Sequence, residues 1–297
     1  MVVAEVDEYL GGEEADRIVR PFELAMPRSL VEAIDLLDHD DPAVRPIGGG
    51  TALMLMMKSG LFRPQRLVSL RAIESRFKTI TTDSDGTLHI GAMTTLATIE
   101  RSSEIRRHAP VITRTMRRLA NTRVRNVATI GGHLAHADPH LDLPPLLVAL
   151  GARLTIAGRD GERTIPVEDL FRGYFETTLR HDELIAEVTV PPQETQRSFY
   201  LKWTARSADD WPALGIAVAL DEHHARIVVG AATEKPTRLA AAEAALGSAR
   251  DEKALRRAGD AAADEAVLVS DQHGSAVYKK ELLRVLVRRA LEGALQQ

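Results

Sequence analysis

Cysteine is absent from this chain of 297 residues, and its absence excludes several kinds of chemistry. Without cysteine the chain has no disulfide, no thiolate-ligated zinc site, no cysteine nucleophile and no iron–sulfur cluster of its own. Any redox chemistry therefore needs an organic cofactor or a metal held by a partner protein. The lack of disulfides also agrees with a cytoplasmic location, which is the location that we expect.

Long apolar runs and a large charge of one sign are also missing. No stretch approaches the roughly 20 apolar residues that span a membrane, and residues 1–16 lack the basic-then-apolar pattern of a signal peptide. The formal net charge is -4, which gives no general indication of nucleic-acid binding. We therefore expect neither membrane insertion nor a nucleic-acid partner. The length suffices for two modest domains with real cores.

Two glycine-rich segments are the most informative feature that is present. The first covers residues 46–53 (Pro-Ile-Gly-Gly-Gly-Thr-Ala-Leu), and the second covers residues 129–139, with Asp142 just beyond. Each follows a short apolar run that predicts a strand. Glycine lets the backbone approach a ligand closely and turn its N–H groups outward. Two such segments could hold a diphosphate from two sides, which indicates a dinucleotide-like cofactor.

The common nucleotide-binding motifs do not account for these segments. Gly48-x-Gly50 is followed by Leu53, so the pattern G-x-G-x-x-G is not met, and no G-x-x-x-x-G-K-S/T occurs. Taken alone, each segment would favour a tight turn without a ligand. The interpretation therefore depends on the longer pattern around them.

The secondary structure predicted along the chain has two parts. Ser29 and Glu32 form a capping box at the start of a helix. Strands at 43–47 and 66–70, with a helix at 51–59 that ends at Gly60, predict a small βαβ-like unit. Further strands are predicted at 87–92, 153–157, 164–167, 184–190, 199–204, 214–220 and 226–232, and further helices at 105–119, 143–150, 237–246 and 278–295. Pro191-Pro192 indicates a domain boundary.

The glycine segments belong to a series of motifs that keeps one order over residues 20–296. The others include Arg125-Asn126, Ala135-x-Ala137-Asp138-Pro139-x-x-Asp142, Phe171-x-Gly173-Tyr174, Phe199-Tyr200-Leu201-Lys202 and Pro236-x-Arg238. This series closely resembles the FAD-binding medium subunit of molybdenum hydroxylases, the family of xanthine dehydrogenase and carbon monoxide dehydrogenase. An ordered series of this length is far more specific than a lone glycine motif.

The resemblance implies an α+β fold: an FAD-binding domain of the vanillyl-alcohol-oxidase (PCMH) type in two subdomains, then a smaller α+β C-terminal lobe. We predict a flexible tail at residues 1–18, the FAD-binding domain at 19–192 and the C-terminal domain at 193–297. The implied cofactor is FAD. The implied partners are a large subunit with the molybdenum cofactor and a small subunit with 2Fe–2S clusters, assembled as a dimer of heterotrimers.

The same resemblance implies particular contacts with FAD. Main-chain N–H groups and the hydroxyls of Thr51 and Thr129 would donate to the diphosphate and the ribityl chain. Asp142 would accept from ribityl hydroxyls, because it is ionised at neutral pH. Ile185 and Lys202 would lie near the flavin and adenine parts. The full predicted set is Pro46, Ile47, Gly48, Gly49, Gly50, Thr51, Ala52, Leu53, Thr129, Ile130, Gly131, Gly132, His133, His136, Asp142, Ile185 and Lys202.

Histidines and carboxylates gather after the second glycine segment, namely His133, His136, Asp138, His140 and Asp142. They suggest a metal site, but the preceding Gly-Gly and the intervening Pro139 keep them off a single helical face. We therefore predict no metal on this chain. His136 is instead expected beside the isoalloxazine ring, as a polar neighbour that tunes the flavin.

The predicted function is an FAD-containing electron-transfer subunit, which passes electrons from partner 2Fe–2S clusters to an external acceptor. Two alternatives stay open. A free-standing flavin reductase or oxidase on this fold would need its own substrate pocket and proton donor. A non-catalytic assembly subunit would have lost FAD, and departures from the family pattern at Ala52, Leu119 and His133 leave room for it. The substrate and the acceptor (NAD, quinone or oxygen) are not encoded in this chain.

Overall fold

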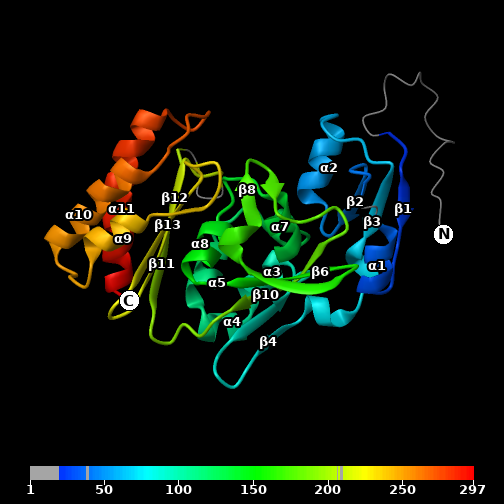
Figure 1. The fold of residues 1–297 in the computed structure, drawn as a ribbon, viewed down its shortest axis with the longest axis horizontal. Coiled ribbons are helices and arrows are strands. Elements are labelled where there is room, and N and C mark those ends of the chain that lie inside the picture. Colours follow the sequence, from blue (N-terminus) through cyan, green and yellow to red (C-terminus); the bar gives the residue numbers. More distant parts are fainter. Residues whose placement is uncertain (1–19, 38–39, 206, 208–209) are drawn as a thin grey trace.

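The computed structural model describes residues 20–37, 40–205, 207 and 210–297. The tail predicted for residues 1–18 lies outside these ranges, so its flexibility stays a prediction. Figure 1 shows three parts in a row along the longest axis. A three-stranded sheet lies at one end, a five-stranded sheet in the middle, and a four-stranded sheet with its helices at the other end.

The N-terminal part is a small parallel sheet with two helices: β1 (Glu23–Ala25), α1 (Leu30–Leu36), β2 (Val44–Ile47), α2 (Thr51–Lys58) and β3 (Arg66–Ser69). The strand order is β1–β3–β2, and both pairings are parallel. Ser29 caps α1, because its Oγ accepts from the Glu32 N–H at 3.1 Å. Gly60 follows α2 with a φ of 70°, which glycine adopts readily. The predicted βαβ unit is confirmed.

The middle part is an antiparallel sheet in the order β4–β5–β10–β6–β7. Its strands are β4 (Ile80–Thr82), β5 (Leu88–Gly91), β6 (Arg153–Gly158), β7 (Gly161–Pro166) and β10 (Leu184–Val190). Its helices are α3 (Leu96–Arg101), α4 (Ser103–His108), α5 (Pro110–Met116), α6 (Thr122–Arg125), α7 (Ile130–His136) and α8 (Leu143–Ala149). Three 3-10 helices, η2 (Leu70–Ala72), η3 (Ser75–Lys78) and η4 (Val167–Leu170), and a two-stranded sheet, β8 (Phe171–Gly173) with β9 (Glu176–Thr177), complete it.

The C-terminal part packs three helices on an antiparallel sheet. It contains β11 (Arg197–Trp203), β12 (Leu214–Leu220), β13 (Ala225–Gly230), β14 (Thr237–Arg238), α9 (Ala240–Leu246), α10 (Glu252–Glu265) and α11 (Ala276–Leu295). Every residue of β12 is buried. Ile216 and Val218 belong to the C-terminal core, whereas Ala217 and Ala219 belong to the core of the middle part. The sheet is therefore buried on both faces and shares its second face with α8.

Several sequence-based predictions of secondary structure are wrong in detail. The helix predicted at 105–119 is two helices, α4 and α5. Pro110 has no N–H to donate within a continuous helix, and it stands instead at the first position of α5. The second glycine segment does not follow a strand; α6 precedes it, and the segment itself begins α7. Thr237 and Arg238 form β14, so the predicted helix starts only at Ala240. The prediction omitted α3 and α10.

Candidate functional site

The two glycine segments meet, although a long stretch of sequence separates them. A Cβ added at Gly48 would lie 2.9 Å from Thr129 Oγ1. A Cβ added at Gly49 would overlap the carbonyl oxygen of Val127. Only glycine lets the end of β2 approach the start of α7 this closely. The structure therefore brings residues 46–53 and 129–133 into one place, as a common ligand site requires.

The first segment leads into α2, and no side chain accepts a hydrogen bond from the N–H groups at the start of this helix. Gly50 precedes α2 with a φ of 75°, and the helix has no side-chain cap. The first helical hydrogen bond runs from the Met54 N–H to the Gly50 carbonyl at 2.9 Å. The N–H groups of Thr51, Ala52 and Leu53 therefore have no acceptor within the helix. Together with the positive end of the helix dipole, they form a site suited to an anion.

The second segment differs, because protein acceptors already take the N–H groups that begin α7. These bonds are Ile130 N–H to Thr94 O (3.0 Å), Gly131 N–H to Ala92 O (2.8 Å) and Gly132 N–H to Thr129 Oγ1 (3.2 Å). A Cβ at Gly131 would lie 2.7 Å from the Cβ of Ala92, so this glycine is needed for packing. The Thr129 hydroxyl accepts one bond and keeps its own proton for donation.

His133, in the middle of α7, supplies an unsatisfied buried atom. Its side chain is buried, and its Nε2 has no hydrogen-bond partner. Burial, with a smaller effect from His136, lowers the pKa of His133 to about 3, so the ring is neutral at physiological pH. A buried ring nitrogen without a partner is uncommon and indicates a missing ligand or water.

His136, at the end of α7, is half-buried. Its ring lies 5.3 Å from the ring of Phe175, at a tilt of 53°. Burial lowers its pKa, and the nearby Asp138 carboxylate opposes this effect. Within the described ranges, no group of three or more histidine, aspartate or glutamate side chains is arranged to hold a metal ion.

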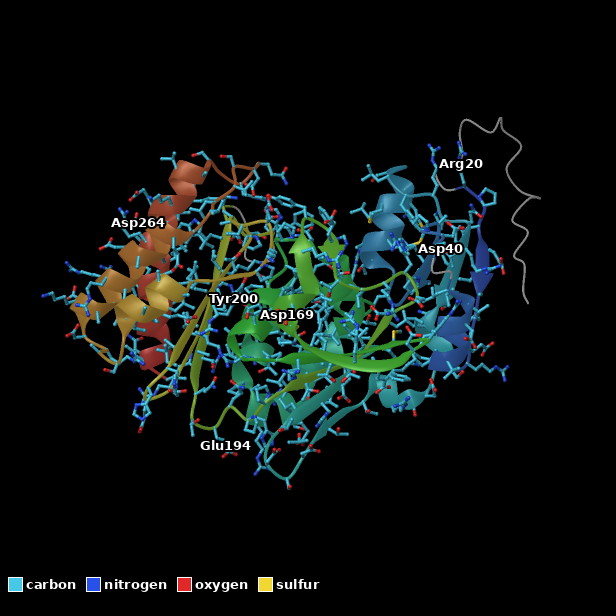
Figure 2. The ribbon with its side chains drawn as sticks, viewed as in Figure 1. Arg20, Asp40, Asp169, Glu194, Tyr200 and Asp264 are labelled. Carbon is cyan, nitrogen blue, oxygen red and sulfur yellow. The ribbon has the colours of Figure 1, made fainter. Side chains whose placement is uncertain are left out.

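Asp142 and Lys202 form a buried ion pair between the middle and C-terminal parts. Asp142 Oδ2 accepts from Lys202 Nζ at 3.0 Å, and Oδ1 accepts from the Tyr200 hydroxyl at 2.8 Å. Lys202 Nζ also donates to the Arg118 carbonyl at 2.8 Å. Burial raises the pKa of Asp142, while Lys202 and Tyr200 act against it. Figure 2 labels Tyr200 in the C-terminal sheet, on the side toward the middle part.

Tyr200 is a partner that the sequence reasoning did not assign, although a signal for it existed. Alternate residues of a strand share a face, so Tyr200 and Lys202 had to point the same way. The adjacent strand makes room for the ring at Gly215, where an added Cβ would overlap the Tyr200 hydroxyl. The pairing with Asp142, however, depends on how β11 meets α8, which no local pattern predicts.

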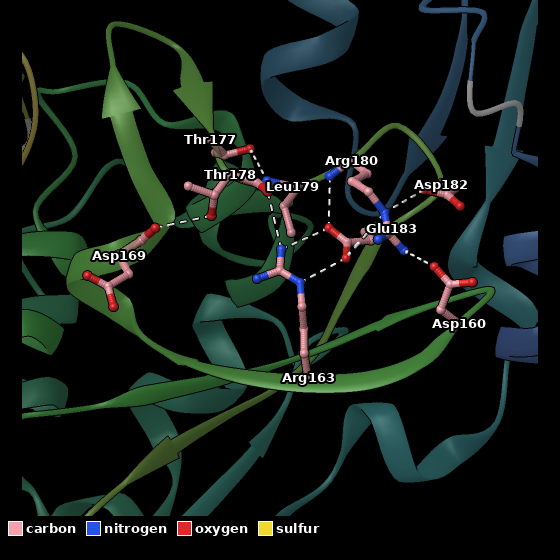
Figure 3. Close-up of polar contacts among 9 residues, drawn as sticks. All are labelled: Asp160, Arg163, Asp169, Thr177, Thr178, Leu179, Arg180, Asp182 and Glu183. Atoms are coloured by element: carbon pink, nitrogen blue, oxygen red, sulfur yellow. Dashed lines mark hydrogen bonds and ion pairs between the residues drawn. The ribbon is translucent and has the colours of Figure 1, made fainter.

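Ile185 lies in β10 with 8% of its surface exposed, and packs into the core of the middle part. Glu183, just before this strand, ties its start to β7 through Arg163. Arg163 donates two hydrogen bonds to the Glu183 carboxylate, of 2.8 and 2.9 Å (Figure 3). The Arg180 N–H donates to the same carboxylate at 2.8 Å. The bond from Arg163 lowers the pKa of Glu183, since it stabilises the ionised form.

Comparison with known proteins agrees with this geometry. Residues 20–193 match the family described as the FAD binding domain in molybdopterin dehydrogenase, which is more than half of the chain. The chain belongs to the FAD-binding medium subunits of molybdenum hydroxylases. Residues 199–294 of this medium subunit match the CO dehydrogenase flavoprotein C-terminal domain. Recognition of the family from its motifs is thereby confirmed.

Individual relatives place this medium subunit among oxidoreductase subunits. It is 31% identical to the carbon monoxide dehydrogenase medium chain of Afipia carboxidovorans over 280 residues, which are 92% of this chain and 96% of that one. It is 32% identical to the nicotine 6-hydroxylase medium subunit of Paenarthrobacter nicotinovorans over 273 residues, 90% and 95% of the two chains. A chain of the solved carbon monoxide dehydrogenase of Hydrogenophaga pseudoflava, a form lacking the Mo-pyranopterin moiety, superposes with a TM-score of 0.90 at 32% identity, covering 94% of this chain and 99% of that chain.

These similarities establish two of the expectations drawn from the sequence. The medium subunit is part of an oxidoreductase and has the predicted α+β fold, with an FAD-binding domain followed by a smaller C-terminal lobe. No helix within the described residues is long and apolar enough to cross a membrane.

Proposed function

We propose that this medium subunit holds FAD where its two glycine segments meet, and passes electrons from partner iron–sulfur clusters to an external acceptor. The observation that carries the proposal is the convergence of Gly48 and Gly49 on residues 127–129, beside an uncapped helix start. The site fits FAD, since a diphosphate needs several N–H donors in a small space. The unsatisfied Nε2 of His133 fits a ligand that carries polar groups.

The two segments have different roles in this proposal. The N–H groups of Thr51, Ala52 and Leu53 bind the diphosphate, because they have no acceptor within α2. The start of α7 gives a surface of small residues, with the Thr129 hydroxyl as donor and His133 as a neutral polar neighbour. Pro46 to Gly50 and Ile130 to Gly132 then bring the main chain close to the cofactor.

The remaining predicted contacts are retained as proposals. Asp142 has donors on both oxygens, yet a carboxylate offers about four acceptor positions, so ribityl hydroxyls can still donate to it. Lys202 Nζ already donates to Asp142 and to the Arg118 carbonyl. Lys202 would therefore act on FAD through its positive charge and not through a direct hydrogen bond. His136 and Ile185 would lie near the ring system. We also propose domain limits at residues 19–192 and 193–297.

The division of labour in the complex follows from the composition of the chain. When bound, FAD supplies the exchange between one-electron and two-electron carriers, which no side chain here can perform. With no cysteine, this chain cannot bind the 2Fe–2S clusters that would deliver the electrons. They and the molybdenum cofactor would belong to a small and a large partner subunit, in a dimer of heterotrimers. The names of relatives as medium chains support such an assembly.

The proposal is tested by expressing the chain with its native neighbours and purifying the product. We expect a visible flavin spectrum, FAD released on denaturation, and iron and molybdenum that co-purify with the chain. FAD on a lone chain that turns over a substrate would indicate a free-standing enzyme instead. A colourless chain within an active complex would indicate an assembly subunit. Either result would overturn the electron-transfer proposal.

A further inference from the structure

His140 lies between two carboxylates from different parts of the chain. Its Nδ1 is 3.1 Å from Asp138 Oδ1, and its Nε2 is 3.0 Å from Asp271 Oδ2. Asp138 and His140 belong to the connection between α7 and α8, whereas Asp271 lies in the turn between α10 and α11. A neutral imidazole carries only one N–H, so only the imidazolium donates to both carboxylates. With both carboxylates ionised, this geometry is satisfied by a proton on each ring nitrogen.

The charges around the ring agree with an imidazolium. Lys279 of α11 has no exposed surface, and its Nζ donates to Asp271 Oδ2 at 2.5 Å. Asp138, Asp271 and Lys279 together leave one negative charge, which a protonated His140 neutralises. Burial opposes the charge on the ring, but its hydrogen bonds to Asp138 and Asp271 outweigh this and raise the pKa of His140.

Other titratable groups also face the cluster from the surrounding elements. His136 Nε2 lies 4.0 Å from Asp138 Oδ2, and the His273 ring centroid lies 5.3 Å from that of His140. The ring of Trp211 stacks on His140 at 5.7 Å, which shields it from solvent. The charges of Asp271 and Glu234 both reach the hydroxyl of Tyr174. Any measured pH dependence must therefore be assigned to His140 by substitution.

We propose that His140 is a positioning residue that docks the C-terminal domain on the α7–α8 connection, and that loss of its second proton loosens the docking. The bridge is made by this chain alone and does not require FAD. Its effect on FAD rests on the proposed function, because the connection follows His133 and His136 and ends at Asp142. A looser connection would move these residues relative to α2.

The direction of the pH effect follows from linkage. A histidine whose pKa is raised by folding stabilises the fold fully below its unfolded pKa, which is about 6.5. That stabilisation is lost as the pH rises through the higher pKa of the folded state. Above that pH the neutral ring keeps one hydrogen bond and turns a lone pair toward the other carboxylate. The docking is therefore firm in mildly acidic solution and weaker in alkaline solution.

The test compares urea unfolding of the full chain without FAD between pH 5.5 and 9. The variants are His140→Gln, which cannot titrate, and the control His181→Gln, at an exposed histidine in the turn before β10. We expect the unfolding equilibrium constant of His140→Gln to exceed that of the wild type by roughly tenfold near pH 6, since a buried charged hydrogen bond is lost. The excess should shrink steadily toward pH 9. The control should follow the wild type throughout.

A difference that stays constant with pH, or that His181→Gln reproduces, would overturn the proposal. If His140→Gln does not fold, histidine NMR titration of the wild type and of Asp271→Asn decides instead. The His140 midpoint must lie above 6.5 in the wild type and fall in the variant; an unchanged midpoint would contradict the bridge. FAD titration of the same proteins separates the two proposals, because a pH-dependent bridge in a chain that binds no FAD refutes only the proposed function.

Discussion

Gly49 shows how a residue can be correctly expected at a site for an incomplete physical reason. From the sequence, its role is to let the backbone approach a ligand. In the structure an added Cβ would first meet the Val127 carbonyl, so the glycine is needed for contact between two segments of the protein. Gly131 is similar, because its neighbour is Ala92. These glycines therefore allow the protein segments around the proposed FAD site to pack together, in addition to lining that site. This packing role is visible only in the folded structure.

Gly49→Ala should consequently lower stability and FAD binding together. Overpacking a close backbone contact costs about 1–3 kcal/mol, and relief would require the end of β2 to move away from α7. Urea unfolding with an FAD titration measures both effects. Gly173→Ala is the matched control, since an added Cβ there meets no atom within 4 Å. Equal stability of the two variants would contradict the close approach.

The partners of Lys202 could not be predicted from the sequence around it. The motif around it identified an important lysine, but not its partner. Its burial and its bonds to Asp142 and to the Arg118 carbonyl depend on the meeting of β11, α8 and the end of α5. These elements are far apart in sequence. No period or spacing within one segment could predict that they converge.

Among the elements, α2 and α7 were not equally predictable. The helix at 51–59 follows from its apolar pattern and from Gly60 at its end, and the structure confirms it. The second segment is predicted from the sequence as a glycine-rich turn that follows a strand, not as a helix. It is helical because Thr129 caps it, and because the carbonyls of Ala92 and Thr94 accept its first N–H groups. Two of those three contacts are tertiary.

The difference between the two helix starts gives a prediction for Ala52→Asp. A carboxylate in the first turn of α2 interacts favourably with the helix dipole and stabilises the fold by about 0.3–1 kcal/mol. Without FAD, the variant should therefore be at least as stable as the wild type. The same charge should repel the diphosphate and weaken FAD binding by roughly tenfold or more. Thermal unfolding and calorimetric FAD titration measure the two effects.

Val277→Asp is the control for this prediction, because it adds one charge at the same position of α11, where the side chain is 77% exposed. It should leave FAD affinity unchanged. If Ala52→Asp binds FAD as tightly as Val277→Asp does, the start of α2 is not the diphosphate site, and the donors must be sought elsewhere.

At the scale of the whole molecule, the fold class and most of the strands were predictable, but the packing of the C-terminal part against the middle part was not. The apolar run of β12 is typical of a strand buried on both faces. Ala217 and Ala219 pack with the middle part while Ile216 and Val218 pack with the C-terminal helices. With the Asp142–Lys202 pair, this makes the C-terminal domain a support for the proposed FAD site.

FAD titration of the purified chain, followed by the change in the visible flavin spectrum, shows whether the two glycine segments together hold FAD. We expect saturable binding of one FAD per chain, weakened by Gly49→Ala and by Ala52→Asp but not by Gly173→Ala or Val277→Asp. A folded chain that takes up no FAD would contradict it. So would binding that is indifferent to all four substitutions, because the meeting of the two glycine segments would then be a structural contact only.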